Sequence, residues 1–507
     1  MLRSPEEAAA LSAANRSAAA ILAAFFAARF VFAFALGLGV DEAYTLPISR
    51  DLNSSYFDHP PLHQWIAHFG ALVFGEGVGA RLSFVAIFVA TGWLLFRLTS
   101  ELFGPRAGLV ALFGLNAAPF FFASAGTWIV PDGPLLFGLA LAALPLARLF
   151  FGPGGNERRA WRLWLLAGLG FGLAGLSKYI AVLTAFGLIA FLVISTKERR
   201  WFRHPAPYAA GALAILMILP VFVWNAQHGW VSFSFQGSRG VTSGGLKPLN
   251  VLQVALGQIA YLSPWLFVPL IAGLYPGLRL RCDGRRLFLL CLSLPPIVVF
   301  SVTPLWVSRS MPHWTMSGWL FVFPLMGAWA QDIAVPVAKL RRYAALSLVL
   351  LAALVAGAVV EARTGWLMRF LPAGAADPTL EAFDWNGLLK APLLQSPPAF
   401  VVSTRWSEAG KIALALGPRV PVFVLSYDPR GWAFVKAGKG LVGRDGVLIV
   451  QAKDLPDARA ALTPLFASFG AGQPFTLSRN GAPAFELALL PVKGLTRPLP
   501  LPYRQGH

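Results

Sequence analysis

The chain has 507 residues, of which 56% are hydrophobic and only 13% are charged. Soluble domains carry about 25% charged residues, so this composition excludes a soluble globular protein and indicates an integral membrane protein. The formal net charge of +19 does not indicate nucleic-acid binding, because the positive residues lie in short clusters between apolar runs, as in the cytoplasmic loops of membrane proteins.

Apolar runs of about 20 residues recur from residue 17 to residue 361 and predict a polytopic α-helical protein with about eleven transmembrane helices. Basic clusters near residues 158–162, 197–203, 279–286 and 339–342 place their loops, and the N-terminus, in the cytoplasm. An odd number of spans then places the C-terminus on the periplasmic side. The predicted spans are 17–37, 77–97, 107–123, 133–151, 163–177, 179–196, 207–224, 252–275, 287–302, 315–332 and 343–361.

The first loop, about residues 38–76, contains the segment "DEAYTLPISRDLNSSYFDHPPL". Asp41 and Glu42 open this segment, and acids beside a span are either solvated interfacial charges or groups with a chemical role. Tyr44 and Tyr56 are aromatic residues of the kind that anchor a loop at the membrane interface. A loop anchored in this way holds its carboxylates in defined positions.

The same segment ends with Asp58-His59-Pro60-Pro61. The two prolines fix φ and predict a rigid corner. Asp58 and His59 are either a structural turn with a hydrogen-bonded aspartate or part of a divalent-metal site, and one such pair is not a complete metal site.

Further candidates are expected on the same side of the membrane. Asp132 in "PDGP" is either a turn residue or an acid of the site, and Lys178 in "LSKY" either snorkels to the interface or has a function. Arg29, inside the first span, is either functional or paired within the bundle. Four residues of later loops are candidates by position, although each alone is typical of a surface: His228, Arg239, Arg309 and His313.

Residues 362–507 predict a small α/β periplasmic domain that follows a transmembrane domain of residues 1–361. The runs "AFVVSTRW", "VPVFVLSY" and "GVLIVQA" predict strands, and "SEAGKIALALG" predicts a helix that ends at Gly417. Asn480-Gly481 predicts the turn of a β-hairpin.

The candidates together offer carboxylates for a general base and cations for a phosphate on one membrane face, which favours group transfer from a lipid phosphate carrier. The segments "DEAYTLPISRDLNSSYFDHPPL", "PDGPLLFG", "LSKYIAVL" and "MPHWTMSGWLFVFPL" resemble the GT-C glycosyltransferases of the bacterial protein-mannosyltransferase-like superfamily. Relatives in that superfamily include protein O-mannosyltransferases and the lipid A aminoarabinose and galacturonic acid transferases. The resemblance covers roughly residues 15–335, and the tail matches in outline.

The resemblance implies a helical bundle in the bacterial inner membrane, with a first periplasmic loop that lies along the membrane as two short helices. It implies inverting transfer of one sugar from a polyprenyl phosphate to an acceptor. Asp41 matches the family's catalytic aspartate, Asp132 matches the second-loop aspartate, and Lys178 matches the lysine near the carrier phosphate. The aminoarabinose enzymes typically have Glu-Lys where this chain has Asp58-His59, which weakens the case for aminoarabinose as the sugar and leaves the ligand of this corner open.

In the expected mechanism Asp41 is the general base, and Glu42 either orients it or binds the acceptor. Lys178, Arg239 and Arg309 are the candidates for binding the donor phosphate. The residues expected either to contact substrate or to form the corner of the motif are Tyr44, Tyr56, Asp58, His59 and His313. No cofactor is expected to be required, and Asp58 with His228 is the candidate pair if a divalent metal ion is bound.

The expected partners are a polyprenyl-phosphate-linked sugar, a lipid or glycan acceptor such as lipid A or lipopolysaccharide, and membrane lipids. Protein is an alternative acceptor, and the sugar (hexose, pentose or uronic acid) and the oligomeric state stay open. A transporter or flippase of a lipid-linked sugar is the alternative function, but the polar groups gather at one face rather than at midplane and the chain shows no internal repeat. A scaffold role would give the first-loop acids no purpose.

Overall fold

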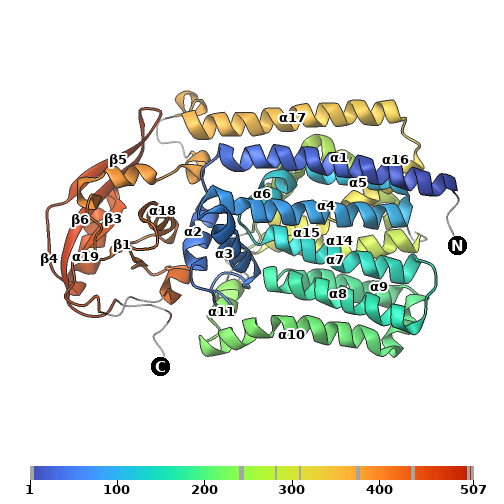
Figure 1. Ribbon diagram of the computed structural model, residues 1–507, viewed down its shortest axis with the longest axis horizontal. Coiled ribbons are helices and arrows are strands. Elements are labelled where there is room, and N and C mark those ends of the chain that lie inside the picture. The colour runs from blue at the N-terminus through green and yellow to red at the C-terminus, as the bar shows by residue number, and fades with distance from the viewer. Residues whose placement is uncertain are drawn as a thin grey trace. The chain divides into compact units, whose positions relative to one another are not determined.

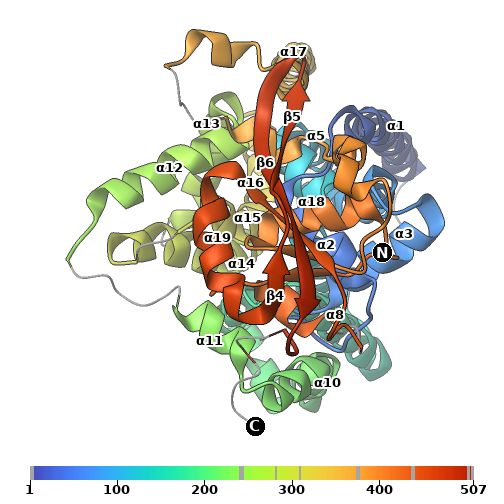
Figure 2. The ribbon, with the colours of Figure 1, turned by 90° about the vertical axis from the view of Figure 1, so that its left-hand side faces the viewer.

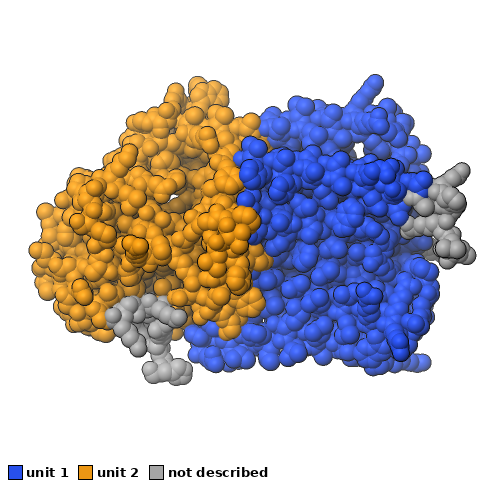
Figure 3. All heavy atoms as spheres, viewed as in Figure 1, with its two compact units in different colours: residues 1–32, 59–63, 82–353 blue, residues 33–58, 64–81, 354–507 orange. Residues whose placement is uncertain are grey.

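The computed structural model describes residues 5–238, 245–279, 283–307, 310–372, 377–435, 440–499 and 503. The chain forms two compact units, which are coloured separately in Figure 3. Unit 1 comprises residues 1–32, 59–63 and 82–353, and unit 2 comprises residues 33–58, 64–81 and 354–507. Unit 2 therefore joins most of the first loop to the C-terminal residues.

Unit 1 is helical (Figure 1). Within the described residues, seven helices are long and apolar enough to cross a membrane, or up to nine if each of two bent pairs counts as one span. The seven segments are Ala9–Ala35, Val78–Phe103, Asp132–Phe151, Glu157–Ser177, Pro205–Gln227, Gly284–Leu305 and Val337–Thr364. The prediction of a polytopic helical membrane protein is confirmed.

The two bent pairs correspond to predicted spans. Helix α5 (Pro105–Ala117) and the segment Phe120–Thr127 meet at 83°, and α12 (Pro248–Leu262) meets Pro264–Leu278 at 102°. Pro119 and Pro264 lie at the breaks, where proline removes a helical N–H and disfavours the preceding turn. The predicted span 179–196 is the shorter helix α9 (Ala181–Ile194), and 315–332 is divided into α15 (Met316–Trp319) and α16 (Val322–Asp332). The count of eleven spans stays a prediction.

Helix α8 (Glu157–Ser177) packs between α7 (Asp132–Phe151) and α10 (Pro205–Gln227), as Figure 1 shows. Gly138 of α7 and Gly170 of α8 permit this packing, because a Cβ on either residue would lie 2.5–2.7 Å from backbone atoms of the other helix. Small residues let helix backbones approach closely in membranes. Other α-helices of the described residues are α1 (Pro5–Ala35), α4 (Arg81–Phe103), α6 (Ala125–Thr127), α11 (Val231–Ser238), α13 (Pro264–Leu274), α14 (Gly284–Val302) and α17 (Val337–Thr364).

Unit 2 contains a six-stranded mixed sheet (Figure 2). The strands run in the order β2-β1-β3-β6-β4, and β5 also pairs with β6. Strand β1 is parallel to β2 and β3, whereas β6 is antiparallel to its three neighbours. The strands are β1 (Val401–Ser403), β2 (Val422–Val424), β3 (Gly446–Gln451), β4 (Phe466–Phe469), β5 (Gln473–Arg479) and β6 (Ala482–Leu495).

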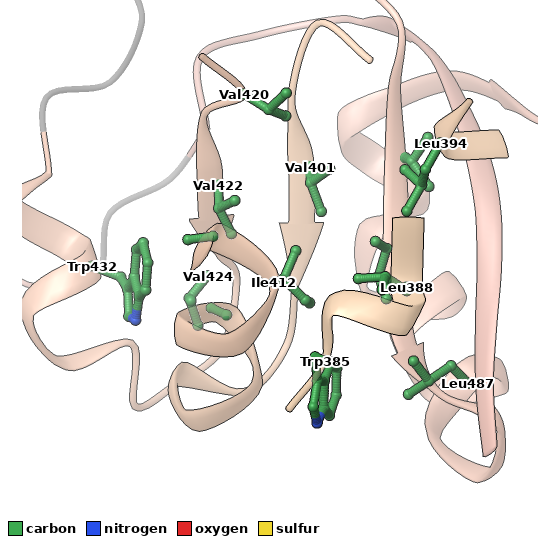
Figure 4. Packing of buried hydrophobic residues seen from close by; sticks show 14 of the residues in the cluster. Trp385, Leu388, Leu394, Val401, Ile412, Val420, Val422, Val424, Trp432 and Leu487 are labelled. Atoms are coloured by element: carbon green, nitrogen blue, oxygen red, sulfur yellow. The ribbon is translucent and has the colours of Figure 1, made fainter. Parts of the chain in front are cut away.

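The sheet separates two apolar clusters, because alternate residues of each strand point to opposite faces. One cluster contains Val401, Leu487 and Ile412 of helix α18 (Trp406–Leu416), and it is shown in Figure 4. The other contains Val402 and Leu462 of helix α19 (Leu455–Leu462). The small α/β fold predicted for the tail is confirmed.

The turn predicted at Asn480-Gly481 joins β5 to β6, and both residues have positive φ (49° and 82°), as a tight hairpin turn requires. The first loop forms two short helices, α2 (Val40–Ser49) and α3 (Leu62–Phe74). Helix α2 packs against α18, and its residues Tyr44 and Ile48 belong to the same apolar cluster as Ile412.

Candidate functional site

Asp41 and Glu42 lie in the first turn of α2 and have different environments. Glu42 is 1% exposed, and its Oε2 accepts a hydrogen bond from the Gly39 N–H at 2.8 Å. This backward bond is half of a capping box, and the partial positive charge of a helix N-terminus stabilises both acids. Asp41 is exposed. The local sequence therefore buries one carboxylate and presents the next to solvent.

Arg81 holds Glu42 in place. Its Nε lies 2.7 Å from Glu42 Oε1 and its Nη2 lies 2.5 Å from Oε2, so the pair is bidentate. Both side chains are almost fully buried, with 1% and 2% of their surface exposed. The same guanidinium donates to three main-chain carbonyls at the end of α1, those of Ala33, Leu36 and Gly37. Of the two alternatives for Glu42, this burial favours orientation of Asp41 over direct binding of the acceptor.

Tyr44 links the first loop to the C-terminal part of unit 2. Its hydroxyl donates to Asp58 Oδ2 and accepts from the Gly431 N–H at 2.8 Å. Burial raises the pKa of Tyr44 well above its usual value, and the charge of Asp58 adds to this shift. The phenol is therefore neutral at physiological pH and acts as a donor to the carboxylate.

Arg430 lies beside the same carboxylate. Its Nη1 is 3.7 Å from Asp58 Oδ1, and its guanidinium lies 3.7 Å from the ring centroid of Trp406. Arg430 has a positive φ of 50°, a region in which non-glycine residues are uncommon and strained. Asp58 is 5% exposed, so the hydrogen-bonded structural corner is the alternative that its surroundings favour.

Tyr56 has partners within the loop. Its hydroxyl donates to the Asp51 carbonyl at 2.9 Å and accepts from the Asn53 N–H at 3.2 Å. Burial raises the pKa of Tyr56 to about 12. The ring is 4% exposed and belongs to the apolar cluster of unit 2, so its contacts stabilise the loop.

In unit 1 the structure brings Asp132 and Lys178 together. Lys178 Nζ lies 2.9 and 3.0 Å from the two carboxylate oxygens of Asp132, and both residues are buried (5% and 7% exposed). Asp132 begins α7 and Lys178 follows the last residue of α8, so each charge also complements the dipole of its own helix. Lys178 does not snorkel away from the protein.

His63, for which the sequence pattern gave no signal beyond its position four residues after His59, lies near this pair. The rings of His59 and His63 are 5.6 Å apart and nearly perpendicular. Burial lowers the pKa of His63 to about 3. The positive charge of Lys178 also lowers this pKa, whereas the negative charge of Asp132 raises it. A neutral imidazole therefore lies close to the Asp132–Lys178 ion pair at physiological pH.

The other candidates lie elsewhere in unit 1. The His228 ring stacks on Trp224 with centroids 4.1 Å apart, and His313 stacks on Phe120 at 6.5 Å. Arg239 and Arg309 lie outside the described residues. No group of three or more His, Cys, Asp or Glu side chains that is suited to a metal ion occurs among the residues that the structure describes. The metal pair of Asp58 and His228 stays a prediction.

Of the two alternatives for Arg29, a functional role or pairing within the helical bundle, the structure shows the pairing. Its guanidinium donates to Asn116 Oδ1 at 2.8 Å and to the carbonyls of Phe121 and Phe122 at 3.2 Å. It also lies 4.6 Å from the ring centroid of Phe88. Arg29 thus donates to carbonyls of the π-helical segment Phe120–Ser124, where the α-helical hydrogen-bond pattern is interrupted.

Comparisons with known proteins agree with this architecture. A family described as dolichyl-phosphate-mannose-protein mannosyltransferase matches residues 58–224. Lipid A galacturonosyltransferase RgtD of Rhizobium johnstonii is 26% identical over 290 residues, which cover 55% of this chain and 58% of that protein. The undecaprenyl phosphate-alpha-4-amino-4-deoxy-L-arabinose arabinosyl transferase of Edwardsiella ictaluri is 26% identical over 300 residues, which cover 52% of this chain and 50% of that protein.

Two solved structures of ArnT from Cupriavidus metallidurans share the fold. The apo structure superimposes with a TM-score of 0.63 at 14% identity, covering 94% of this chain and 98% of ArnT. The structure bound to undecaprenyl phosphate gives 0.60 at 15% identity, covering 93% and 97%. The matches to the two curated relatives span 58% and 50% of their lengths. The chain therefore shares the fold of these structures and is similar in sequence to bacterial glycosyltransferases, in agreement with its motifs.

Proposed function

We propose that this protein is an inverting glycosyltransferase that moves one sugar from a polyprenyl-phosphate donor to a lipid or glycan acceptor of the bacterial envelope. The reaction takes place at the periplasmic face of the inner membrane, with the N-terminus in the cytoplasm and residues 362–507 in the periplasm. The observation that carries the proposal is the first turn of α2, where exposed Asp41 follows a segment fixed by the buried Glu42–Arg81 pair.

Asp41 acts as the general base. It removes the proton of the acceptor hydroxyl while that oxygen attacks the anomeric carbon, the bond from this carbon to the phosphate oxygen breaks, and polyprenyl phosphate leaves. Proton transfer of this kind contributes about 10²–10⁴-fold to the rate. Because the attack occurs opposite the leaving group, the anomeric configuration is inverted.

Cations stabilise the phosphate as it gains charge. Lys178 is the first candidate because it is a buried ammonium, and Asp132 acts by holding it at 2.9 Å. Arg239 and Arg309 are further candidates on sequence grounds. The role of Asp132 in this scheme is orientation of the lysine rather than proton transfer.

The relatives support a narrower choice of substrates. RgtD is named a lipid A galacturonosyltransferase, and one ArnT structure contains undecaprenyl phosphate. We therefore propose undecaprenyl phosphate or a similar polyprenyl phosphate as the carrier and lipid A or lipopolysaccharide as the acceptor. Asp58-His59 replaces the Glu-Lys expected of aminoarabinose enzymes, so a uronic acid or a neutral sugar is favoured over aminoarabinose.

A reconstituted assay tests this proposal. Purified protein is mixed with lipid A and, in separate reactions, with polyprenyl phosphates that carry a hexose, a pentose or a uronic acid. Mass spectrometry should detect one sugar added to lipid A and an equal amount of released polyprenyl phosphate. Asp41→Asn should lose this activity, whereas the loop variant Asp51→Asn should retain it. Transfer by Asp41→Asn at the wild-type rate would remove Asp41 from the role of base.

A further inference from the structure

Cations of unit 2 bind main-chain carbonyls at the end of α1 and in the segment between α1 and α2. The last carbonyls of a helix have no partner within the helix and need donors from elsewhere. Arg81 donates to three of them, and Arg363 Nε donates to the Ala35 carbonyl at 3.0 Å. Lys411 of α18 donates to the carbonyl of Leu38, three residues before Asp41. The segment that leads to the proposed base is therefore fixed by three cations.

Lys411 uses all three of its N–H donors on main-chain oxygens. Besides Leu38, its Nζ contacts the carbonyls of Glu381 at 2.8 Å and Phe383 at 2.9 Å. The residue is 6% exposed. One ammonium thus joins α18, the turn around residues 381–383 and the segment before α2.

Two glycines show that the main chain before and within α2 lies close to the C-terminal residues. A Cβ added at Gly410 would lie 2.5 Å from the Ala43 carbonyl oxygen. A Cβ added at Gly37 would lie 2.4 Å from the Ala382 carbonyl oxygen. The main chain near Asp41 therefore approaches α18 at Ala43 and the turn around residues 381–383 at Gly37.

We infer that Lys411 is a positioning residue for the transfer reaction, and that α18 of the C-terminal domain thereby sets the position of Asp41. This inference rests on the proposed role of Asp41 as the base. Lys411 does not touch the reacting atoms. It holds the segment from which α2 begins, and small displacements of a catalytic group are costly, since about 1 Å can reduce a rate by roughly 10²-fold.

The charge state of Lys411 gives the inference a specific signature. Burial lowers the pKa of Lys411 to about 8, and the positive charge of Arg81 lowers it further. The negative charges of Glu42, Asp384 and Glu381 act in the opposite direction and raise this pKa. Loss of the proton leaves two N–H donors for three carbonyls. Activity should therefore decline as the pH rises through about 8.

The titration of Lys411 itself should not lower the stability over the same range. The pKa of Lys411 in the folded protein is below the usual 10.5, so between about pH 8 and 10.5 the unfolded chain binds more protons at this site. Under that condition the free energy of unfolding rises with pH. A fall in activity without a fall in melting temperature therefore separates loss of positioning from loss of structure.

The test measures kcat, KM for the donor and the melting temperature from pH 6.5 to 10, for wild type, Lys411→Met, Lys411→Arg and the exposed control Lys390→Met. Wild type and the control should lose kcat above about pH 8. Lys411→Met should have a kcat about 10–100-fold lower at pH 7, little change in KM and no decline above pH 8. Lys411→Arg keeps its charge and should remove the alkaline decline even if Lys411→Met does not fold.

An unchanged alkaline decline in the folded Lys411 variants, or a wild-type kcat in Lys411→Met, would overturn the inference while leaving the proposed function intact. Absence of transfer by wild type from every donor at every pH would instead overturn the proposed function.

Discussion

Replacement of Arg81 by methionine tests whether the buried ion pair holds the start of α2. The change removes five hydrogen bonds, two to the Glu42 carboxylate and three to main-chain carbonyls. Glu42 would remain 1% exposed in the folded protein without its bidentate partner. Removing one partner of a buried ion pair costs about 3–5 kcal/mol, because the remaining charge is desolvated without compensation.

The matched control is Arg50→Met. Arg50 also pairs with a glutamate, Glu76, but both side chains are 26% exposed. Such a pair contributes about 0–1 kcal/mol. A domain of 150–250 residues loses about 2–4 °C in melting temperature per kcal/mol, so Arg81→Met should lower the melting temperature by about 6–20 °C and Arg50→Met by about 4 °C or less.

The assay is thermal unfolding of the purified protein in detergent, followed by tryptophan fluorescence. Adding Glu42→Gln to Arg81→Met should restore part of the loss, because a neutral amide is less costly to bury than an isolated carboxylate. Equal shifts for Arg81→Met and Arg50→Met, or no recovery in the double variant, would refute the idea that burial of Glu42 makes Arg81 necessary.

Two other predictions concern packing and pH. Gly410→Ala should lower the melting temperature because its Cβ would lie 2.5 Å from the Ala43 carbonyl oxygen. The control Gly211→Ala in α10, where the new Cβ would meet no atom within 4 Å, should raise the melting temperature slightly. Equal shifts for the two variants would contradict the close packing of α18 on α2. His63 has a pKa lowered to about 3, so its stabilising contribution is complete above about pH 6.5 and is lost as the pH falls toward 3, by roughly 1.4 kcal/mol per pH unit. His63→Gln should weaken the decrease in melting temperature between pH 7 and pH 4.5, and an unchanged decrease would show that His63 is not buried in its neutral form.

The membrane fold and the tail could be predicted because their signals are local. Apolar length gives the spans, and β-branched runs, the helix that ends at Gly417 and the turn at Asn480-Gly481 give the α/β unit. The breaks at Pro119 and Pro264 and the division of residues 315–332 are less visible, because a run of apolar residues looks the same whether its helix is straight or broken.

The site could be predicted only in part. The motif gave Asp41, Glu42, Asp132 and Lys178 as candidates, and their roles stay predictions. Residue types do not reveal that Glu42 is buried while Asp41 is exposed. Arg81 had a weak signal, since it lies at the outer end of a predicted span, where the positive-inside rule does not expect a cation.

Lys411 and Arg430 had no sequence signal. They reach the first loop from positions more than 370 residues further along the chain, and only the tertiary structure brings those segments together. Contacts of this kind depend on how the C-terminal sheet and α18 pack on α2, which no local pattern encodes.

The most direct test of the central claim is mass spectrometry of envelope lipids from a deletion strain complemented with wild type, Asp41→Asn or Asp51→Asn at equal expression. We expect the deletion strain to lack one sugar on lipid A or lipopolysaccharide and to accumulate the polyprenyl-phosphate sugar, and we expect wild type and Asp51→Asn, but not Asp41→Asn, to restore the glycan. Full restoration by Asp41→Asn would contradict the assignment of the base. An unchanged glycan with lipid-linked sugar redistributed between leaflets would contradict the transferase function and favour a transporter.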